Sequence, residues 1–162
     1  MKRPLYVVAT EDEKARFVPV GEESIVTGVG YANVFDALKS VPRDRQIINI
    51  GYAGSNKIPV GKLCNIAVVE NYHPNASYES DKIYILEDDG VINGYVCYTS
   101  NDFVTKTSIQ DPCVFDMELY AICAMGFSAV KAKKLITDNL SARQYKDNTG
   151  VDVCNTKAGK AE

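Results

Sequence analysis

Short apolar runs alternate along the chain with amphipathic and polar stretches, a pattern that is typical of α/β proteins. The apolar runs predict strands over residues 5–9, 24–27, 47–50, 63–69, 82–86, 91–98 and 129–137. The run over residues 47–50 is expected to end at the glycine-containing segment that starts with Gly51. We therefore expect a mixed, twisted β-sheet flanked by helices, in a single domain over residues 1–162.

Two helices of different character follow from the same pattern. The first is amphipathic and ends before Pro42, because its apolar side chains share one face: Tyr31, Val34, Phe35, Leu38 and Val41. The second covers residues 116–125, is apolar nearly all round after its first residues, and is therefore expected to be buried. Beyond Leu140 the chain turns polar, and we expect residues 142–162 to form a polar C-terminal tail.

Composition and charge are those of an ordinary globular domain. The chain has 162 residues, of which 46% are hydrophobic and 24% charged, which argues against a disordered protein. Its 18 Lys and Arg residues against 21 Asp and Glu residues give a net charge of −3, too acidic for a protein whose main task is to hold nucleic-acid phosphates. No apolar run reaches the roughly 18 residues of a membrane-spanning helix. The basic start is followed by too short an apolar run for a signal peptide.

Cysteine usage indicates a reducing compartment. The five cysteines are odd in number, and no pair has the C-x-x-C spacing: Cys64, Cys97, Cys113, Cys123 and Cys154. Most lie in apolar stretches, so we interpret them as small buried hydrophobic residues. With one histidine and no suitable thiolate spacing, a zinc site is not expected. We predict a cytoplasmic protein without metal or cofactor.

Several carboxylates stand at the ends of predicted elements, and each allows two interpretations. Asp116 could cap the buried helix and Glu118 could interact with its dipole, or both could bind the hydroxyl groups of a ligand, since few cations are near in sequence. Asp138 ends a strand, either as an Asx turn or at the strand edge where α/β sheets bind ligands. The cluster Glu11-Asp12-Glu13 is either a solvated turn or the acid-rich start of a helix.

Other familiar motifs are incomplete. The turn Gly28-Val29-Gly30 is followed by Asn33 where a dinucleotide-binding fingerprint has glycine, and the chain has no phosphate-binding P-loop. His73 is the single histidine, which is more often a surface or interface residue than a catalyst. No spacing supports a Ser–His–acid or Cys–His arrangement.

Taken in order, several segments resemble the nucleoside phosphorylase and nucleosidase superfamily, and most closely its 5′-methylthioadenosine/S-adenosylhomocysteine nucleosidases. The resemblance covers about residues 5–141. The segments that carry it are Val8-Ala9-Thr10-Glu11-Asp12-Glu13, Thr27-Gly28-Val29-Gly30-Tyr31-Ala32-Asn33, Ile48-Asn49-Ile50-Gly51-Tyr52-Ala53-Gly54, Tyr72-His73, Phe115-Asp116-Met117-Glu118 and Ile136-Thr137-Asp138.

The resemblance implies cleavage of the N-glycosidic bond of a purine nucleoside, through an oxocarbenium-like sugar. Asp138 would donate a proton to purine N7, which a buried carboxylic acid can do at neutral pH, and Glu13 would orient or deprotonate the attacking water. The remaining implied contacts are those of Glu118 with the ribose hydroxyls, Met117 with the sugar, and Phe103 and Val104 with the base. A nucleoside substrate and a homodimer, through residues 31–41 or 63–69, are the implied partners.

The sequence also departs from the family pattern. Tyr52 stands where a serine or threonine is usual and could fill part of the site, while Asp116 replaces a glutamate and Pro74-Asn75 replace an acidic pair. The chain is short and is expected to lack the helix after Asp138 that helps to close the base pocket. No arginine lies near the expected phosphate position, which favours water over phosphate as the nucleophile. A phosphorylase and a degenerate, non-catalytic interaction module remain the alternatives.

Overall fold

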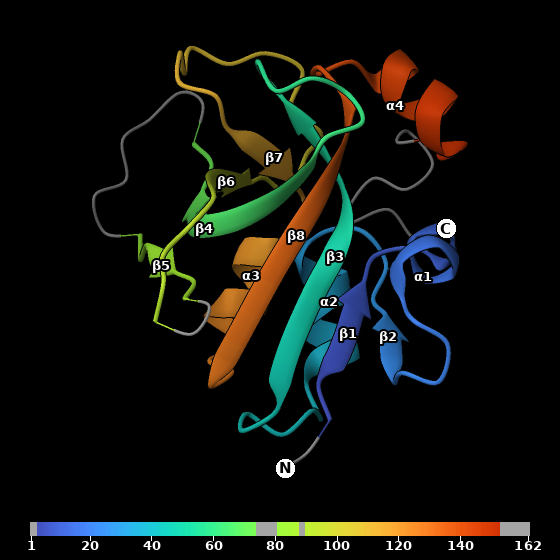
Figure 1. The fold of residues 1–162 in the computed structure, drawn as a ribbon, viewed down its shortest axis with the longest axis vertical. Helices are drawn as coiled ribbons and strands as arrows, with labels where there is room; N and C mark the ends of the chain where they lie inside the picture. Colours follow the sequence, from blue (N-terminus) through green and yellow to red (C-terminus); the bar gives the residue numbers. More distant parts are fainter. Residues whose placement is uncertain (1–2, 74–80, 88–89, 153–162) are drawn as a thin grey trace.

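The computed structural model describes residues 3–73, 81–87 and 90–152, which form a mixed β-sheet with short helices packed around it (Figure 1). The strands are β1 (Leu5–Val8), β2 (Ser24–Val26), β3 (Gln46–Ser55), β4 (Leu63–Asn71), β5 (Tyr84–Ile85), β6 (Tyr95–Thr99), β7 (Val114–Asp116) and β8 (Ala129–Asp138). The helices are α1 (Glu11–Phe17), α2 (Tyr31–Leu38), α3 (Leu119–Ala124) and α4 (Ala142–Thr149).

Part of the sheet closes on itself. Strand β3 pairs with β7, β7 with β6, and β6 with β4, while β8 pairs with both β4 and β3 and so completes a ring. Strands β1 and β2 continue the sheet from β3 as parallel neighbours. The sheet contains parallel and antiparallel pairs, so the expected mixed α/β architecture is confirmed, whereas the closure was not anticipated from the sequence.

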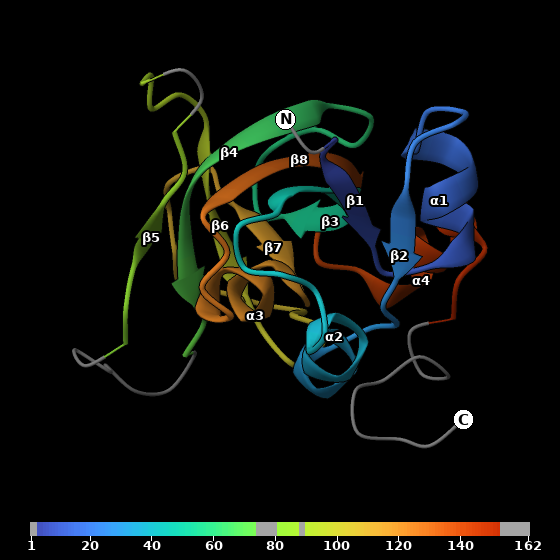
Figure 2. The same ribbon diagram turned by 90° about the horizontal axis from the view of Figure 1, so that it is seen from below.

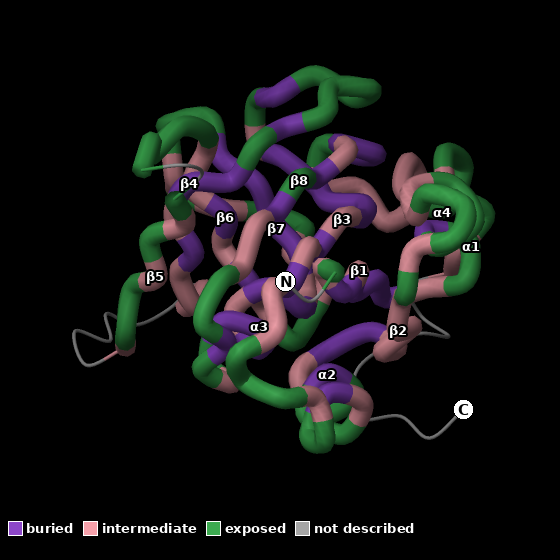
Figure 3. Tube along the Cα trace, turned by 60° about the horizontal axis from the view of Figure 1, so that its bottom comes forward, coloured by how far each residue is buried: buried purple, intermediate pink, exposed green. Residues whose placement is uncertain are grey.

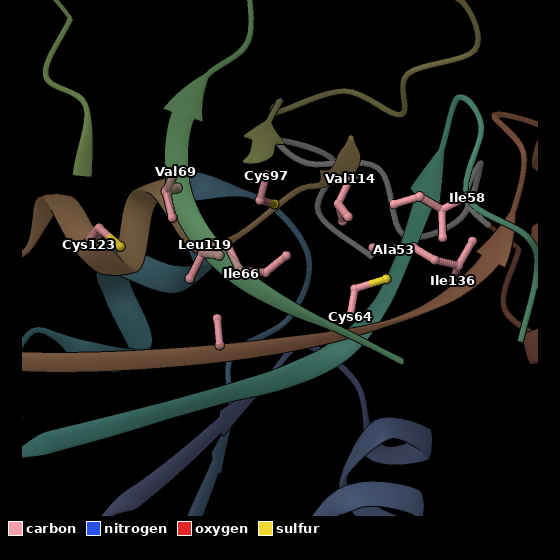
Figure 4. Packing of buried hydrophobic residues seen from close by; sticks show 11 residues of the cluster. Ala53, Ile58, Cys64, Ile66, Val69, Cys97, Val114, Leu119, Cys123 and Ile136 are labelled. Atoms are coloured by element: carbon pink, nitrogen blue, oxygen red, sulfur yellow. The ribbon is translucent and has the colours of Figure 1, made fainter. Parts of the chain in front are cut away.

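Two hydrophobic clusters hold these elements together. One lies within the ring of strands (Figure 4) and consists of Ala53, Ile58, Cys64, Ile66, Val69, Cys97, Val114, Leu119, Cys123, Ala132 and Ile136. With Cys113, the cysteines at positions 64, 97 and 123 are buried free thiols, as the sequence predicts. Burial of apolar area of this kind is the main stabilising contribution to a fold of this size.

The second cluster lies between β1, β3 and the helices α2 and α3, which cover the same side of the sheet (Figure 2). Val34 and Leu38 of the predicted apolar stripe are fully buried in it, but Phe35 remains 42% exposed. Figure 3 shows this division along α2, where buried and exposed positions alternate around the helix.

Several expected boundaries are wrong. The helix expected from residue 116 begins only at Leu119, because residues 114–116 pair as strand β7, and the strand expected from residue 91 begins only at Tyr95. Strand β3 does not end at Gly51 but continues to Ser55, because β8 pairs with it along its length and β7 pairs with its last residues. Residues 142–149 do not belong to a polar tail but form α4, which begins at Ser141 with a side-chain cap and ends at Gly150 in the left-handed conformation. A helix is therefore present after Asp138, where the sequence analysis expected none.

Some expectations lie outside the described residues: Pro74-Asn75, Cys154 and residues 153–162 of the predicted tail. Within the described part of the chain, no helix has the length and apolar character needed to cross a membrane.

Candidate active site

A pocket opens at the carboxyl ends of the parallel strands β1, β3 and β8, where ligands commonly bind in α/β proteins. It brings together segments from most of the chain. Its lining residues are Ala9, Thr10, Glu13, Val29, Tyr52, Ala53, Gly54, Phe103, Val104, Phe115, Asp116, Met117, Glu118, Asp138, Leu140 and Tyr145. Every site residue expected from the sequence is among them.

Glu13 is fixed in the pocket wall by the start of α1. Thr10 caps this helix in a capping box with Glu13, so the acidic cluster is a helix start rather than a solvated turn. The Glu13 carboxylate turns inward and is only 4% exposed. Its Oε1 accepts the backbone N–H of Ala9 at 2.7 Å, and its Oε2 accepts that of Tyr52 at 2.7 Å.

Gly51 makes room for this carboxylate. A Cβ atom at position 51 would lie 2.3 Å from Glu13 Oε2, closer than real contacts allow. Burial raises the pKa of Glu13, while the charge of Lys134 and the backbone N–H groups oppose that increase. The net effect is an upward shift of the Glu13 pKa, limited by these fixed donors.

Asp138 is the last residue of β8 and lines the same pocket as Glu13. A shift in the β3–β8 register sets Asp138 opposite Gly54, where a Cβ atom would lie 2.8 Å from Asp138 Oδ2. The carboxyl accepts Thr137 Oγ1 at 3.2 Å and the Ser141 N–H at 3.3 Å. Asp138 is fully buried, and no cation of the described residues is among the groups that shift its pKa. Burial therefore raises the pKa of Asp138.

Glu118 immediately precedes α3 and lines the pocket. Its Oε2 accepts the N–H of Gly30 at 3.1 Å, and Gly30 has a φ of 93°, which glycine adopts without strain. Burial first, and then the charge of Asp116, raise the pKa of Glu118 to about 8. The turn Gly28–Gly30 thus supplies a donor to a carboxylate and not to a dinucleotide.

Asp116 has a different environment from the one expected. Its sequence neighbourhood suggested a ligand as its partner, but Lys134 Nζ lies 3.0 Å from its Oδ2, and both side chains are almost completely buried. Its oxygens also accept Thr99 Oγ1 at 2.5 Å and the Leu119 N–H at 2.8 Å, so Asp116 of β7 binds the first N–H of α3 although the N-cap position belongs to Glu118. Burial opposes its ionisation, but Lys134 outweighs burial and lowers the pKa of Asp116.

Lys134 was missed in the sequence, although a signal was present. It lies in β8 between Ala132 and Ile136, in phase with these buried residues. Burial disfavours its ammonium, but Asp116, and more weakly Glu118 and Glu13, raise the pKa of Lys134. The lysine is not among the pocket-lining residues, so its charge lies behind Asp116.

Tyr52, the most conspicuous departure from the family pattern, does not fill the pocket. Its hydroxyl donates to Asp12 of α1, and its ring packs edge-on against Phe17 at 5.5 Å between centroids. Arg16 lies over the same ring. None of these three partners lines the pocket, so the Tyr52 ring is directed toward α1.

The far wall of the pocket is aromatic and apolar. Phe103 and Val104 come from the loop between β6 and β7, and Met117 from the turn before α3. The ring of Phe103 contacts that of Tyr145, with centroids 5.6 Å apart. Tyr145 of α4 was missed because the sequence predicted a tail there, and Leu140, just before that tail, was not assigned to the site.

His73 lies away from this pocket. Its ring is bonded to Asp81, and neither residue lines the pocket. This agrees with the interpretation of His73 as a surface or interface residue and not a catalyst.

The arrangement was compared with known proteins. Neither a scan against models of protein families nor a search of curated proteins finds a match. Among solved structures, the nucleosidase CT263 (MTAN) of Chlamydia trachomatis bound to MTA superposes with a TM-score of 0.74 at 18% identity, over 98% of this chain and 94% of that one. This chain has the nucleosidase fold.

Further solved structures support the same fold. The 5′-methylthioadenosine/S-adenosylhomocysteine nucleosidase of Helicobacter pylori has a TM-score of 0.72 at 14% identity, over 97% of this chain and 95% of that one. The futalosine hydrolase of Helicobacter pylori has a TM-score of 0.68 at 14% identity, over 94% and 93%. The fold implied by the sequence resemblance is therefore confirmed.

Proposed function

We propose that the protein is a nucleosidase that hydrolyses the N-glycosidic bond of a purine nucleoside. The observation that carries this proposal is the convergence of Glu13, Glu118 and Asp138 on one pocket. A binding module has no need of three buried carboxyl groups without a facing cation, because each costs free energy to bury. Perturbed carboxyl groups that gather in a cleft are typical of catalytic sites.

The environment of each carboxyl group supports a separate role. Asp138, whose pKa is raised by burial, donates its proton to N7 of the purine as the bond between C1′ and N9 breaks. The bonding electrons leave with the base. Water then attacks C1′ and gives a proton to Glu13, which the N–H groups of Ala9 and Tyr52 hold in place. The products are the free base and the free sugar.

Glu118 stabilises the sugar during this reaction. Its pKa of about 8 keeps a proton on the carboxyl of the ligand-free protein at neutral pH. The ribose hydroxyls become stronger donors as positive charge develops at C1′, so their hydrogen bonds to the Glu118 carboxyl strengthen as the reaction proceeds. Stabilisation that increases toward the transition state is the kind that accelerates a reaction.

The charge of the pocket favours water over phosphate. Among the described residues that line it there is no lysine or arginine, whereas Glu13, Asp116, Glu118 and Asp138 are present. Lys134 does not change this balance, because Asp116 neutralises it at 3.0 Å. A phosphate dianion would enter an acidic pocket without a counter-ion, which disfavours a phosphorylase.

We further propose a cytoplasmic homodimer that works without cofactor or metal. The exposed Phe35 of α2 and Leu63 of β4, which are 42% and 49% exposed, support self-association through the regions named above. Sedimentation of the purified protein at several concentrations tests this. A monomer at all concentrations would contradict it.

The function is tested by mixing the protein with methylthioadenosine, adenosylhomocysteine, adenosine, inosine and uridine, with and without phosphate, and measuring the released base by chromatography. We expect base release from purine nucleosides without phosphate, and none from uridine. Release that requires phosphate would replace the nucleosidase by a phosphorylase. Absence of release from all of them would favour a degenerate relative.

A further inference from the structure

The buried helix α3 begins without a cap of its own. Glu118 occupies its N-cap position, but the Glu118 side chain accepts no hydrogen bond from the first turn of α3. A cap residue ordinarily provides this acceptor, because the first N–H groups of a helix have no partner within the helix. Glu118 Oε2 instead accepts the N–H of Gly30. The carboxyl that could cap the helix is therefore used in the pocket.

Two neighbouring strands, β6 and β7, provide the missing acceptors. Asp116 Oδ2 accepts the N–H groups of Glu118 at 3.3 Å and of Leu119 at 2.8 Å. Thr99 Oγ1 accepts the N–H of Tyr120 at 3.0 Å. Three consecutive N–H groups are thus bound by side chains of the sheet, which holds the backbone that carries Glu118.

Thr99 joins these acceptors into one unit. It lies opposite Asp116 in the parallel pair of β6 and β7, and it is fully buried. Its hydroxyl donates to Asp116 Oδ1 at 2.5 Å, and Lys134 Nζ holds Asp116 Oδ2 at 3.0 Å. Its carbonyl accepts the N–H of Tyr72 at 2.8 Å, so its backbone is fixed as well. Thr99 does not line the pocket and can act on it only through Asp116 and the start of α3.

We propose that Thr99 is a positioning residue that sets the place of the Glu118 carboxyl in the pocket and thereby its contact with the ribose hydroxyls. This inference rests on the proposed nucleosidase function. Without the Thr99 hydroxyl, Asp116 loses one of its donors and the Tyr120 N–H loses its acceptor, so the start of α3 shifts to find new partners. Small shifts of a positioning element lower catalysis, because the groups around the substrate must be closely aligned.

The test compares kcat/KM for adenosine with that for 3′-deoxyadenosine, which lacks one of the hydroxyl groups assigned to Glu118. We expect the wild type to prefer adenosine. Thr99→Val keeps the shape but not the hydroxyl and should reduce this preference about 10-fold, as for the loss of one strong hydrogen bond. Thr99→Ser keeps the hydroxyl and should keep the preference. A residue that only stabilises the fold would lower the rate on both nucleosides alike.

Thr137→Val is the matched control. Thr137 is another buried threonine near a strand end, but its hydroxyl donates to Asp138 at 3.2 Å, on the side of the acid. We expect this variant to lower kcat on both nucleosides alike and to leave the preference unchanged.

A double-mutant cycle with Glu118→Gln tests whether Thr99 acts through Glu118. Glu118→Gln should reduce the preference for adenosine as Thr99→Val does. The double variant should lose little more than either single variant, because the effects of residues that act as a unit do not add. Calorimetric binding of both nucleosides to Asp138→Asn, with and without Thr99→Val, gives a readout that does not need turnover. Thr99→Ala replaces Thr99→Val if the valine variant does not fold.

The outcomes separate the two proposals. An unchanged preference in Thr99→Val, a lost preference in Thr99→Ser, or additive losses in the double variant would overturn the role of Thr99 and leave the nucleosidase intact. Discrimination in binding that depends on Thr99, without cleavage by the wild type, would support the positioning and contradict catalysis. Absence of both binding and cleavage would overturn both proposals.

Discussion

Asp116 and Asp138 are both buried aspartates at strand ends of the same pocket, yet their environments are opposite. Lys134 lies 3.0 Å from Asp116 and lowers its pKa, whereas no cation of the described residues is among the groups that shift Asp138, and burial raises its pKa. One side of the pocket therefore holds an anion paired within the fold, and the other holds the group that we propose as the acid. The comparison teaches that the partner of a carboxyl group, more than its burial, decides its role.

Replacing the acid should have the largest effect. Asp138→Asn keeps the shape and the acceptor for Ser141 but cannot donate the proton, so we expect kcat for base release to fall by about 10²- to 10⁴-fold. The free energy of unfolding should change little. Asp147→Asn, an exposed substitution on α4, is the control. Full activity in Asp138→Asn would refute its role as the acid.

Removing the cation from the other aspartate should act on stability. Lys134→Met leaves Asp116 buried without a counter-charge, which costs about 3–5 kcal/mol of unfolding free energy by comparison with other buried pairs. The exposed neighbour Lys133→Met should stay within about 0.5 kcal/mol of the wild type. Urea denaturation measures both, and equal stabilities would show that the pair is not needed.

Two glycines of β3, Gly51 and Gly54, offer a subtler way to disturb each carboxyl group. Gly54→Ala would place a methyl group against Asp138, and Gly51→Ala would place one against Glu13. Each should cost about 1–3 kcal/mol of stability through overpacking. The pH dependence of kcat should also change. Gly54→Ala should shift the high-pH limb, which reports the acid Asp138, and Gly51→Ala should shift the low-pH limb, which reports the base Glu13. An unchanged profile in both variants would contradict the assigned pair of acid and base.

The last expected effect is a slope of stability with pH. Glu118 is raised from its ordinary value of 4.5 to about 8, so the folded protein holds a proton that the unfolded chain releases over this range. Stability from this group is therefore complete below about pH 4.5 and is lost as the pH rises toward about 8, by at most about 1.4 kcal/mol per pH unit. Asp116 contributes in the opposite sense, with stability lost only in acid.

The variant Glu118→Gln, which imitates the protonated form, isolates this slope. We expect its unfolding free energy to depend less steeply on pH than that of the wild type between pH 5 and pH 8. Urea denaturation at several pH values makes the comparison. Identical slopes would argue that Glu118 is ionised in the ligand-free protein.

The site residues could be predicted because short segments of the sequence resemble a known family. The apolar pattern alone marked the end of the strand that carries Asp138, the acidic segment that carries Glu13 and the start of the buried helix that carries Glu118, but it left two interpretations open for each. The pairing of Asp116 with Lys134 was not visible, because a partner 18 positions away on another strand depends on how β7 and β8 fold together. Helix α4 was missed because its polar sequence has no buried residue, so hydrophobic periodicity could not reveal it.

The closure of the sheet also escaped prediction for a physical reason. Strand β8 pairs along β3 through its whole length and with β4 only at a few positions, and local pattern does not specify which edges meet. The extension of β3 through two glycines was hidden for a related reason. Gly51 and Gly54 look like breaks in the sequence, but in the structure they leave space for two carboxyl groups.

The most direct test of the account is the protonation of the two aspartates. Carboxyl carbons of ¹³C-labelled aspartate report ionisation in NMR spectra recorded across the pH range. We predict one signal that titrates above ordinary aspartate and disappears in Asp138→Asn, and another that titrates below it and is assigned to Asp116. The reverse order, or ordinary titration of both, would contradict the assignment of Asp138 as the acid of the site.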